Sequence, residues 1–233
     1  MPGEAEIARI GSLLADRTRA AMLLALLGGR PMSASALADA AGASPSLASA
    51  HLRKLVDGGL LLVEPSGRQR LYRLANAVAD ALEALMVLAP PERVTSLRAA
   101  VRGQNLRRAR MCYEHLAGTA GVALAEALTA RGVLVPGGDG GYALGPAAPA
   151  VLAQIGVVVE RLERRRRPLA RACMDWSERR HHLAGSLGAA LTSRLIELGW
   201  LRLAEASRVV RVTPGGSRGL DEWLALDLAA VGA

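Results

Sequence analysis

Apolar residues recur with helical spacing along most of residues 1–90. The pattern predicts four helices in succession, over residues 7–15, 17–27, 35–41 and 45–57. Glycines follow the last three, as expected where helices end. Ser44 and Pro45 mark the start of the fourth helix, because serine caps helix N-termini and proline lacks the N–H that would be unpaired there.

Residues 60–74 are predicted to form a β-hairpin. Two short apolar runs flank a turn that contains Pro65 and Gly67, the residue types that most often reverse the chain. Arg68 and Arg70 make the tip of this hairpin basic.

Residues 77–88 return to helical spacing. Their apolar stripe suits a dimer interface, although a face packed in the core would look the same; its members include Val78, Leu82 and Leu85. Pro90 and Pro91 end this helix. We therefore expect one domain over residues 1–90, used for DNA binding and dimerisation, and a C-terminal domain over residues 91–233.

The second half of the chain contains an internal repeat. Residues 115–134 align without gaps with residues 182–201, and ten of the twenty paired positions are identical. Each copy is followed by a probable hairpin, a proline and a further helix. Helix, hairpin and helix are the skeleton of a winged domain. We therefore expect a mainly α protein with small β-hairpin wings, whose C-terminal domain holds two winged-helix-like repeats, at about 110–156 and 173–226.

Charge and composition favour a nucleic-acid partner. The 233 residues are 51% apolar and 21% charged, which is typical of a globular protein, and they carry a net charge of +8. A basic balance attracts polyanions. Aromatic residues are only 3% of the chain, which disfavours a single-strand binder, because such proteins stack bases on aromatic faces.

The chain shows no sign of export or membrane insertion. No apolar run approaches the roughly 18 residues that cross a bilayer, so we expect no membrane partner. The first residues include Glu4 and Glu6 and no basic segment before an apolar stretch, unlike a secretory signal. Two cysteines far apart provide no disulfide framework. We therefore expect a cytoplasmic protein.

Residues 33–59 contain the parts of a helix-turn-helix. One face of the second helix is apolar, and small polar residues lie near the N-terminus of the opposite face, where they can approach base edges. Arginine and lysine suit phosphates, and the basic hairpin would reach the backbone or the minor groove. The expected contacts to double-stranded promoter DNA are Ser44, Ser46, Ser49, Ala50, His51, Arg53, Lys54, Arg68 and Arg70. The alternatives are a merely solvated helix face, or a protein-interaction module that keeps the winged fold without binding DNA.

Residues 17–74 resemble the ArsR-type winged-helix family of transcriptional regulators. The motifs that carry the resemblance are Asp16-Arg17-Thr18-Arg19, Ser44-x-Ser46-x-x-Ser49-x-His51-Leu52-Arg53-x-Leu55 with Gly58-Gly59-Leu60 after it, and Gly67-Arg68-x-Arg70-x-Tyr72-x-Leu74. The resemblance implies a homodimer built from the first and last helices of the domain. It also implies repression that an effector relieves.

The metal sites of that family are not carried over. Metal-sensing members use cysteines on the third helix, or His, Asp and Glu on the last helix. Here residues 35–41 contain no cysteine, and residues 77–88 offer Asp80 and Glu83 but no histidine. No metal site is therefore assigned from the resemblance, and no cofactor is expected with certainty.

Cysteine and histidine recur in the two repeats. Cys112 and His115 are three residues apart and would share a face if the segment were helical. Cys173 and His182 are their counterparts, with about six extra residues between them. The four residues are a candidate effector or redox site, able to bind a soft metal or metalloid ion or to sense oxidants. Buried structural side chains, an organic effector between the repeats, and no effector at all are the alternatives.

An enzyme is not expected. The sequence contains no P-loop, dinucleotide fingerprint or nucleophile elbow. Residues 137–141 are rich in glycine, but a hairpin turn explains them better than a phosphate-binding loop. Two further charge runs, residues 107–110 and 164–167, are expected to be solvated helix faces, with extra phosphate contacts or an acidic ligand as the alternatives.

Overall fold

The computed structural model describes residues 4–75, 77–90, 93–94, 96–163, 168–205 and 207–228. The chain divides into two compact units, Met1–Leu82 and Glu83–Ala233. The division falls within one helix, α5 (Val78–Leu88), ahead of Pro90. None of the described helices is long and apolar enough to cross a bilayer.

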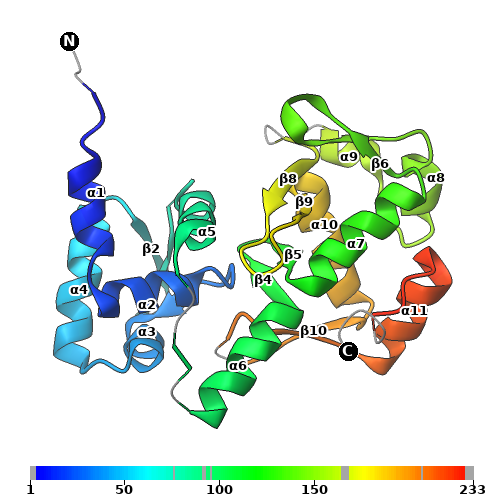
Figure 1. The fold of residues 1–233 in the computed structure, drawn as a ribbon. Coiled ribbons are helices and arrows are strands. Elements are labelled where there is room, and N and C mark those ends of the chain that lie inside the picture. Colours follow the sequence, from blue (N-terminus) through cyan, green and yellow to red (C-terminus); the bar gives the residue numbers. More distant parts are fainter. Residues whose placement is uncertain are drawn as a thin grey trace. The chain divides into compact units, whose positions relative to one another are not determined.

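The N-terminal unit is a winged helix-turn-helix (Figure 1). Its elements before α5 are α1 (Ile7–Leu14), α2 (Arg17–Leu26), β1 (Met32–Ser33), α3 (Ala34–Ala41), α4 (Pro45–Asp57), β2 (Leu61–Ser66) and β3 (Gln69–Leu74). All the helices and both hairpin strands expected in this half are confirmed. Strand β1 was not expected from the sequence; its two residues pair with β3 and complete the sheet order β1-β3-β2.

Local capping explains where these helices begin. The side chains of Asp16, Ser33 and Ser44 accept hydrogen bonds from backbone N–H groups in the first turns of α2, α3 and α4 respectively. Gly42 has a φ of +61° and turns the chain between α3 and α4, a conformation that favours glycine. The core of the unit is made of leucines from α2, α3 and α4, with Leu61 of β2 opposite Leu74 of β3.

After α5, the C-terminal unit contains α6 (Leu97–Arg108) and then two structural repeats. The first repeat contains β4 (Arg110–Cys112), β5 (His115–Ala117), α7 (Thr119–Ala130), β6 (Leu134–Pro136), a short 3-10 turn η1 (Gly138–Gly140), β7 (Tyr142–Leu144) and α8 (Ala148–Ala153). After α9 (Val159–Glu163), the second contains β8 (Arg171–Met174), β9 (His181–Ala184), α10 (Gly185–Glu197), β10 (Leu201–Leu203), β11 (Val210–Val212) and α11 (Pro214–Leu224). The internal repeat and its hairpins are confirmed.

The start of each repeat differs from the expected helix. Residues 110–117 form a tight hairpin, in which Cys112 lies directly opposite His115, so the two share a strand pair and not a helix face. Gly118 is the reason, because its φ of +80° separates β5 from α7, and a side chain there would lie 2.3 Å from the Arg107 carbonyl oxygen. Gly185, with a φ of +84°, does the same in the second repeat.

Each repeat packs its first long helix on the other repeat. In the C-terminal unit, α7 contacts β9 and α10 contacts β5. A Cβ at Gly121 of α7 would lie 3.6 Å from the Cβ of His182 in β9, and a Cβ at Gly188 of α10 would lie 3.3 Å from the Cβ of His115 in β5. The Leu116 N–H also donates to Thr192 Oγ1 of α10 at 2.9 Å. The paired repeats therefore share one core.

Candidate functional sites

The exposed face of α4 consists mainly of small polar and basic side chains. Ser46, Ser49 and Ala50 are exposed near its N-terminus, and Arg53 and Lys54 are exposed further along. Leu47, 47% exposed, lies among them. The Ser49 hydroxyl donates to the Pro45 carbonyl oxygen, and the Ser44 side chain caps the helix. The exposed face of α4 therefore combines short side chains near its N-terminus with two exposed cations further along.

His51 is placed differently from the expectation. Its ring is buried, and Nδ1 lies 3.3 Å from the Arg19 guanidinium and 3.7 Å from the Asp16 carboxylate. Arg19 also donates to the carbonyl oxygens of Ser12 and Leu13. The ring therefore fixes α4 against α1 and α2, and we do not include His51 among the proposed DNA contacts.

The hairpin β2–β3 supplies a basic wing. Gly67 has a φ of +59° at the tip, and Arg68 and Arg70 are exposed beside it. An ion pair between Glu64 and Arg73 crosses the two strands near their base. These features leave the arginines of the tip available to solvent.

The expected dimer stripe of α5 is only partly exposed. Leu85 and Leu88 are 45% and 81% exposed, and Val78 is half-buried. Leu82 is buried within the chain itself and leaves little surface for a partner. Ile7 of α1 is 78% exposed.

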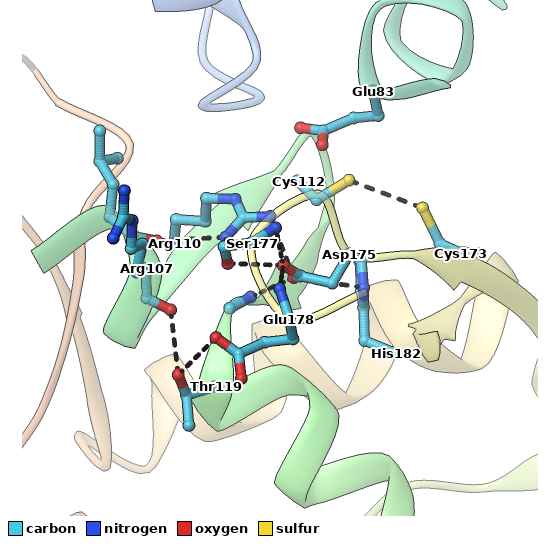
Figure 2. Close-up of polar contacts among 12 residues, drawn as sticks. Glu83, Arg107, Arg110, Cys112, Thr119, Cys173, Asp175, Ser177, Glu178 and His182 are labelled. Atoms are coloured by element: carbon cyan, nitrogen blue, oxygen red, sulfur yellow. Dashed lines mark hydrogen bonds and ion pairs between the residues drawn. The ribbon is translucent and has the colours of Figure 1, made fainter. Parts of the chain in front are cut away.

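The centre of the C-terminal unit is a buried polar network around Asp175 (Figure 2). The Asp175 carboxylate accepts from Arg110 at 3.0 Å, from the Gly118 N–H at 2.7 Å and from the Ser177 hydroxyl at 2.7 Å. Burial acts to raise the pKa of Asp175, but Arg110 and the hydrogen bonds from Ser177 and Gly118 outweigh it and lower that pKa to about 2. The carboxylate is therefore held in its charged form.

The burial of Arg110 corrects an expectation. This residue belongs to the charge run 107–110, which we expected to be a solvated helix face. Arg110 instead lies in β4 with no exposed surface, and its guanidinium is stacked 4.5 Å from the Trp176 ring. Arg107 and Arg108 are exposed, as expected. The second run, 164–167, lies outside the described residues.

Cys112, His115, Cys173 and His182 come together beside this network. Each cysteine is the cross-strand partner of the histidine in its own repeat, because Cys112 pairs with His115 and Cys173 with His182. The two Sγ atoms lie 4.0 Å apart, and the two histidine Nε2 atoms lie 3.1 Å apart. All four side chains are buried. Figure 2 shows the two sulfurs facing one another and Asp175 between Arg110 and His182.

The cluster has distinct protonation preferences. The hydrogen bond from the Cys112 thiol, together with the adjacent histidine rings, lowers the pKa of Cys173 well below its ordinary value. The same thiol pair and burial raise the pKa of Cys112. Burial lowers the pKa of His115, which keeps its ring neutral at physiological pH. The group can therefore supply both sulfur and neutral imidazole nitrogen.

A buried ion pair connects α5 to the hairpin β10–β11. The Arg208 guanidinium donates to the Glu83 carboxylate at 2.8 Å, and both side chains are buried. The carbonyl oxygen of Arg208 also accepts from the Met111 N–H at 2.7 Å. Arg208 therefore links Met111, the neighbour of Cys112 in the chain, to Glu83 of α5.

The C-terminal unit also contains a cleft. Its volume is about 440 Å³, and its lining includes Arg108 of α6, Thr119 of α7, Arg211 of β11 and Thr213, which directly follows β11. The cleft draws on residues of both repeats and has two arginines at its edge.

Comparison with known proteins agrees with the fold of the N-terminal unit. A family model described as a helix-turn-helix domain matches residues 14–64. Over 219 residues the chain is 39% identical to the uncharacterized HTH-type transcriptional regulator YdfF of Bacillus subtilis (strain 168), a match that covers 94% of this chain and 96% of YdfF. The chain belongs to this family of HTH-type transcriptional regulators.

Two solved structures are similar to the N-terminal part. The homodimeric winged helix-turn-helix DNA-binding domain of Mb0332 from Mycobacterium bovis, a possible ArsR-family transcriptional regulator, is 31% identical, with a TM-score of 0.33. The match covers 38% of this chain and 89% of that domain. HlyU from Vibrio cholerae N16961 is 25% identical with a TM-score of 0.33, and the match covers 35% of this chain and 89% of HlyU.

The residues that surround the cluster were not expected from the sequence. Asp175 was not among the candidate site residues, and Arg110 was expected only as part of a solvated charge run. One signal was available, because the six extra residues of the second hairpin contain Asp175 and Ser177, a pair that often forms a local turn.

Proposed function

We propose that this regulator is a dimeric repressor that binds double-stranded promoter DNA and is relieved by an effector bound to its C-terminal unit. The observation that carries the DNA-binding part is the exposed face of α4, where small side chains lie beside Arg53 and Lys54. A helix of this kind enters the major groove closely, while the cations contact phosphates.

The proposed contacts are Ser44, Ser46, Ser49, Ala50, Arg53 and Lys54 of α4, with Arg68 and Arg70 of the wing. Serines and alanine near the N-terminus of α4 are short enough to approach base edges and thymine methyl groups. Arg68 and Arg70 lie at a hairpin tip, from which they would reach phosphates or the minor groove. Base contacts would set the sequence preference, and the four basic side chains would set most of the affinity.

Dimerisation is proposed through apolar side chains that stay exposed in the single chain. Leu85 and Leu88 of α5 and Ile7 of α1 carry large apolar surfaces in solvent, and Val78 carries part of one. Burial of such surfaces is favourable by about 25 cal/mol per Å². Two copies would place one α4 each in successive major grooves of a two-fold operator.

Relief by an effector is proposed through α5. The buried Glu83–Arg208 pair joins this helix to the hairpin β10–β11, and the Arg208 backbone is bonded to β4. A ligand that shifts β4 or β11 would therefore also move α5. Leu85 and Leu88 of α5, which are proposed to form the dimer interface, would move with it. An organic effector could bind in the cleft lined by Arg108 and Arg211. The volume of this cleft suits a small molecule, and its two arginines suit an anion.

The test is fluorescence anisotropy with a labelled duplex taken from upstream of the protein's own gene. We expect binding whose affinity falls steeply with salt, and a large loss in an Arg53→Ala, Arg68→Ala double variant. The matched control is Arg131→Ala, Arg202→Ala, which removes two exposed arginines from the C-terminal unit and should bind as the wild type does.

Two outcomes contradict the proposal. Full retention of binding by the Arg53→Ala, Arg68→Ala variant would show that α4 and the wing do not contact the duplex. Salt-independent interaction, or none with any upstream duplex, would instead favour a protein-interaction module that has kept the winged fold.

A further inference from the structure

The Cys112, His115, Cys173 and His182 side chains form a closed set of four potential metal ligands. One sulfur and one nitrogen come from each repeat, and one candidate ligand atom from every residue lies within 4.8 Å of all the others. All four side chains are buried, so their positions are not explained by contact with solvent. Four converging donors are the number that a structural tetrahedral site uses.

Two of the six distances between the ligand atoms are close to those of a tetrahedron before any ion is added. With metal–sulfur bonds of about 2.3 Å and metal–nitrogen bonds of about 2.0–2.1 Å, a regular tetrahedron sets two sulfurs about 3.8 Å apart and two nitrogens about 3.3 Å apart. The corresponding distances here are 4.0 Å and 3.1 Å. A disulfide, in contrast, needs its sulfurs at about 2.05 Å, and both cysteines are free.

Asp175 is placed to accept a hydrogen bond from His182, one of the four candidate ligands. Among the described residues none offers a hydrogen bond to the buried Nδ1 atom of His182, and the Asp175 carboxylate oxygen lies 3.6 Å from it. A metal-bound histidine usually donates its other ring N–H to a carboxylate, which fixes the ring orientation. A small movement of the ring on metal binding would bring that hydrogen bond to its usual length.

The charge balance favours a divalent ion. Two thiolates and two neutral imidazoles around a divalent cation give a neutral centre, which is far less costly to bury than an isolated charge. The adjacent Arg110–Asp175 pair is already balanced. Sulfur and imidazole ligands select zinc-like ions over Mg²⁺ and Ca²⁺, which prefer oxygen.

We propose that Cys112, His115, Cys173 and His182 bind one tetrahedral, zinc-like divalent ion at the junction of the two repeats. The site lies neither on α3 nor on α5, and it ties the first hairpin of one repeat to that of the other. Because it is defined by direct ion binding, it stands or falls independently of the proposed DNA contacts.

The experiment uses the full chain, reduced, treated with a chelator and kept anaerobic, and titrated with Co²⁺ as a spectroscopic probe. We expect saturation at one ion per chain, visible bands of four-coordinate cobalt, a thiolate-to-cobalt charge-transfer band, and displacement of all of these by Zn²⁺. Native mass spectrometry of the wild type with Zn²⁺ should show one ion per chain, a readout that needs no variant.

Variants identify the ligands. Cys112→Ser and His182→Gln should each weaken Co²⁺ binding by roughly 100-fold or more, since even the loss of an outer partner costs roughly 10–100-fold. His181→Gln is the matched control, because His181 is the exposed neighbour of His182 and should leave binding unchanged. Circular dichroism of each variant reports whether it has folded.

Three results would overturn the proposal. They are a reduced wild type that takes up no ion by mass spectrometry, cobalt spectra without thiolate charge transfer, and a folded Cys112→Ser variant that binds as tightly as the wild type.

Discussion

The Arg110 guanidinium lies 3.0 Å from the Asp175 carboxylate, and neither side chain has any surface in contact with solvent. The two residues belong to different repeats and are separated by 65 positions in the chain. Asp175 also accepts the Gly118 N–H at the start of α7. This one carboxylate therefore fixes the place where the first repeat turns from strand to helix.

Replacing Asp175 with alanine should destabilise the C-terminal unit strongly. The substitution leaves Arg110 buried without its counter-charge, and breaking a buried pair in this way costs about 3–5 kcal/mol. Urea unfolding of the full chain, followed by circular dichroism, measures the loss. Glu197→Ala is the control, because its pair with Arg194 is exposed and is worth roughly 1 kcal/mol or less. Equal losses in both variants would contradict the role given to the buried pair.

Gly188→Ala should destabilise the protein although alanine is the better helix former. The new Cβ would lie 2.5 Å from the Leu183 carbonyl oxygen, and a strand backbone yields less easily than a side chain. Overpacking of this kind costs about 1–3 kcal/mol. Gly103→Ala in α6 is the matched control, since nothing lies within 4 Å of its Cβ, and it should stabilise by up to about 1 kcal/mol. Thermal unfolding distinguishes the two, and a gain in both would show that α10 can move away from β9.

The N-terminal unit was predictable because its signals are local. Ser44, Pro45 and the glycines after α2, α3 and α4 determine where these elements begin and end, and these signals act within one or two turns. Strand β1 was missed because its two residues are a strand only through pairing with β3. In the repeats, the identities at constant spacing predicted two similar units, but not their contact with one another.

The buried cluster could be predicted only as a list of residues. Sequence indicated Cys112, His115, Cys173 and His182 as counterparts, but it could bring the first two together only on the condition that their segment was helical. Their convergence depends on α7 packing against β9 and α10 against β5, which are contacts across long separations in the chain. The burial of Arg110 has the same origin, since its partner Asp175 lies in the other repeat.

The Asp16 carboxyl should make the N-terminal unit more stable above its pKa than below it. The backbone N–H of Arg19, with the nearby His51 and Arg19 side chains, lowers the pKa of Asp16 below its ordinary value of 3.8. The stabilisation is therefore complete above pH 3.8 and is lost as the pH falls through the lower, folded-state value. Carbon-detected NMR of the carboxyl gives that pKa directly.

The matched variant is Asp16→Asn, which keeps a capping oxygen but cannot titrate. The stability difference between wild type and this variant should shrink on acidification below pH 3.8. A carboxyl that titrates at or above its ordinary pKa would contradict the capping geometry of α2.

Leu88→Glu should shift the proposed dimer toward monomer. Leu88 is 81% exposed in the single chain, so the substitution should change monomer stability by only about 0.5 kcal/mol, whereas a charge in an apolar interface is costly. Sedimentation equilibrium measures the mass. Leu62→Glu is the control, a leucine on β2 that is 39% exposed and outside the proposed interface. A wild type that is monomeric at all concentrations would contradict dimerisation, and a dimer unaffected by Leu88→Glu would place the interface elsewhere.

Arg68→Ala and Ser46→Val should affect DNA binding in different ways. Each phosphate contact contributes about 0.9 to the slope of log affinity against log salt, so losing Arg68 should weaken binding to all duplexes and reduce that slope by about 1. Ser46 is exposed on the first turn of α4, where a change should alter the preference between sequences and leave the slope unchanged. The measurement is anisotropy at several salt concentrations on the upstream duplex and on a scrambled duplex of equal length. An unchanged slope for Arg68→Ala would remove the wing from the interface, and equal preference in Ser46→Val and wild type would remove the first turn of α4 from base contact.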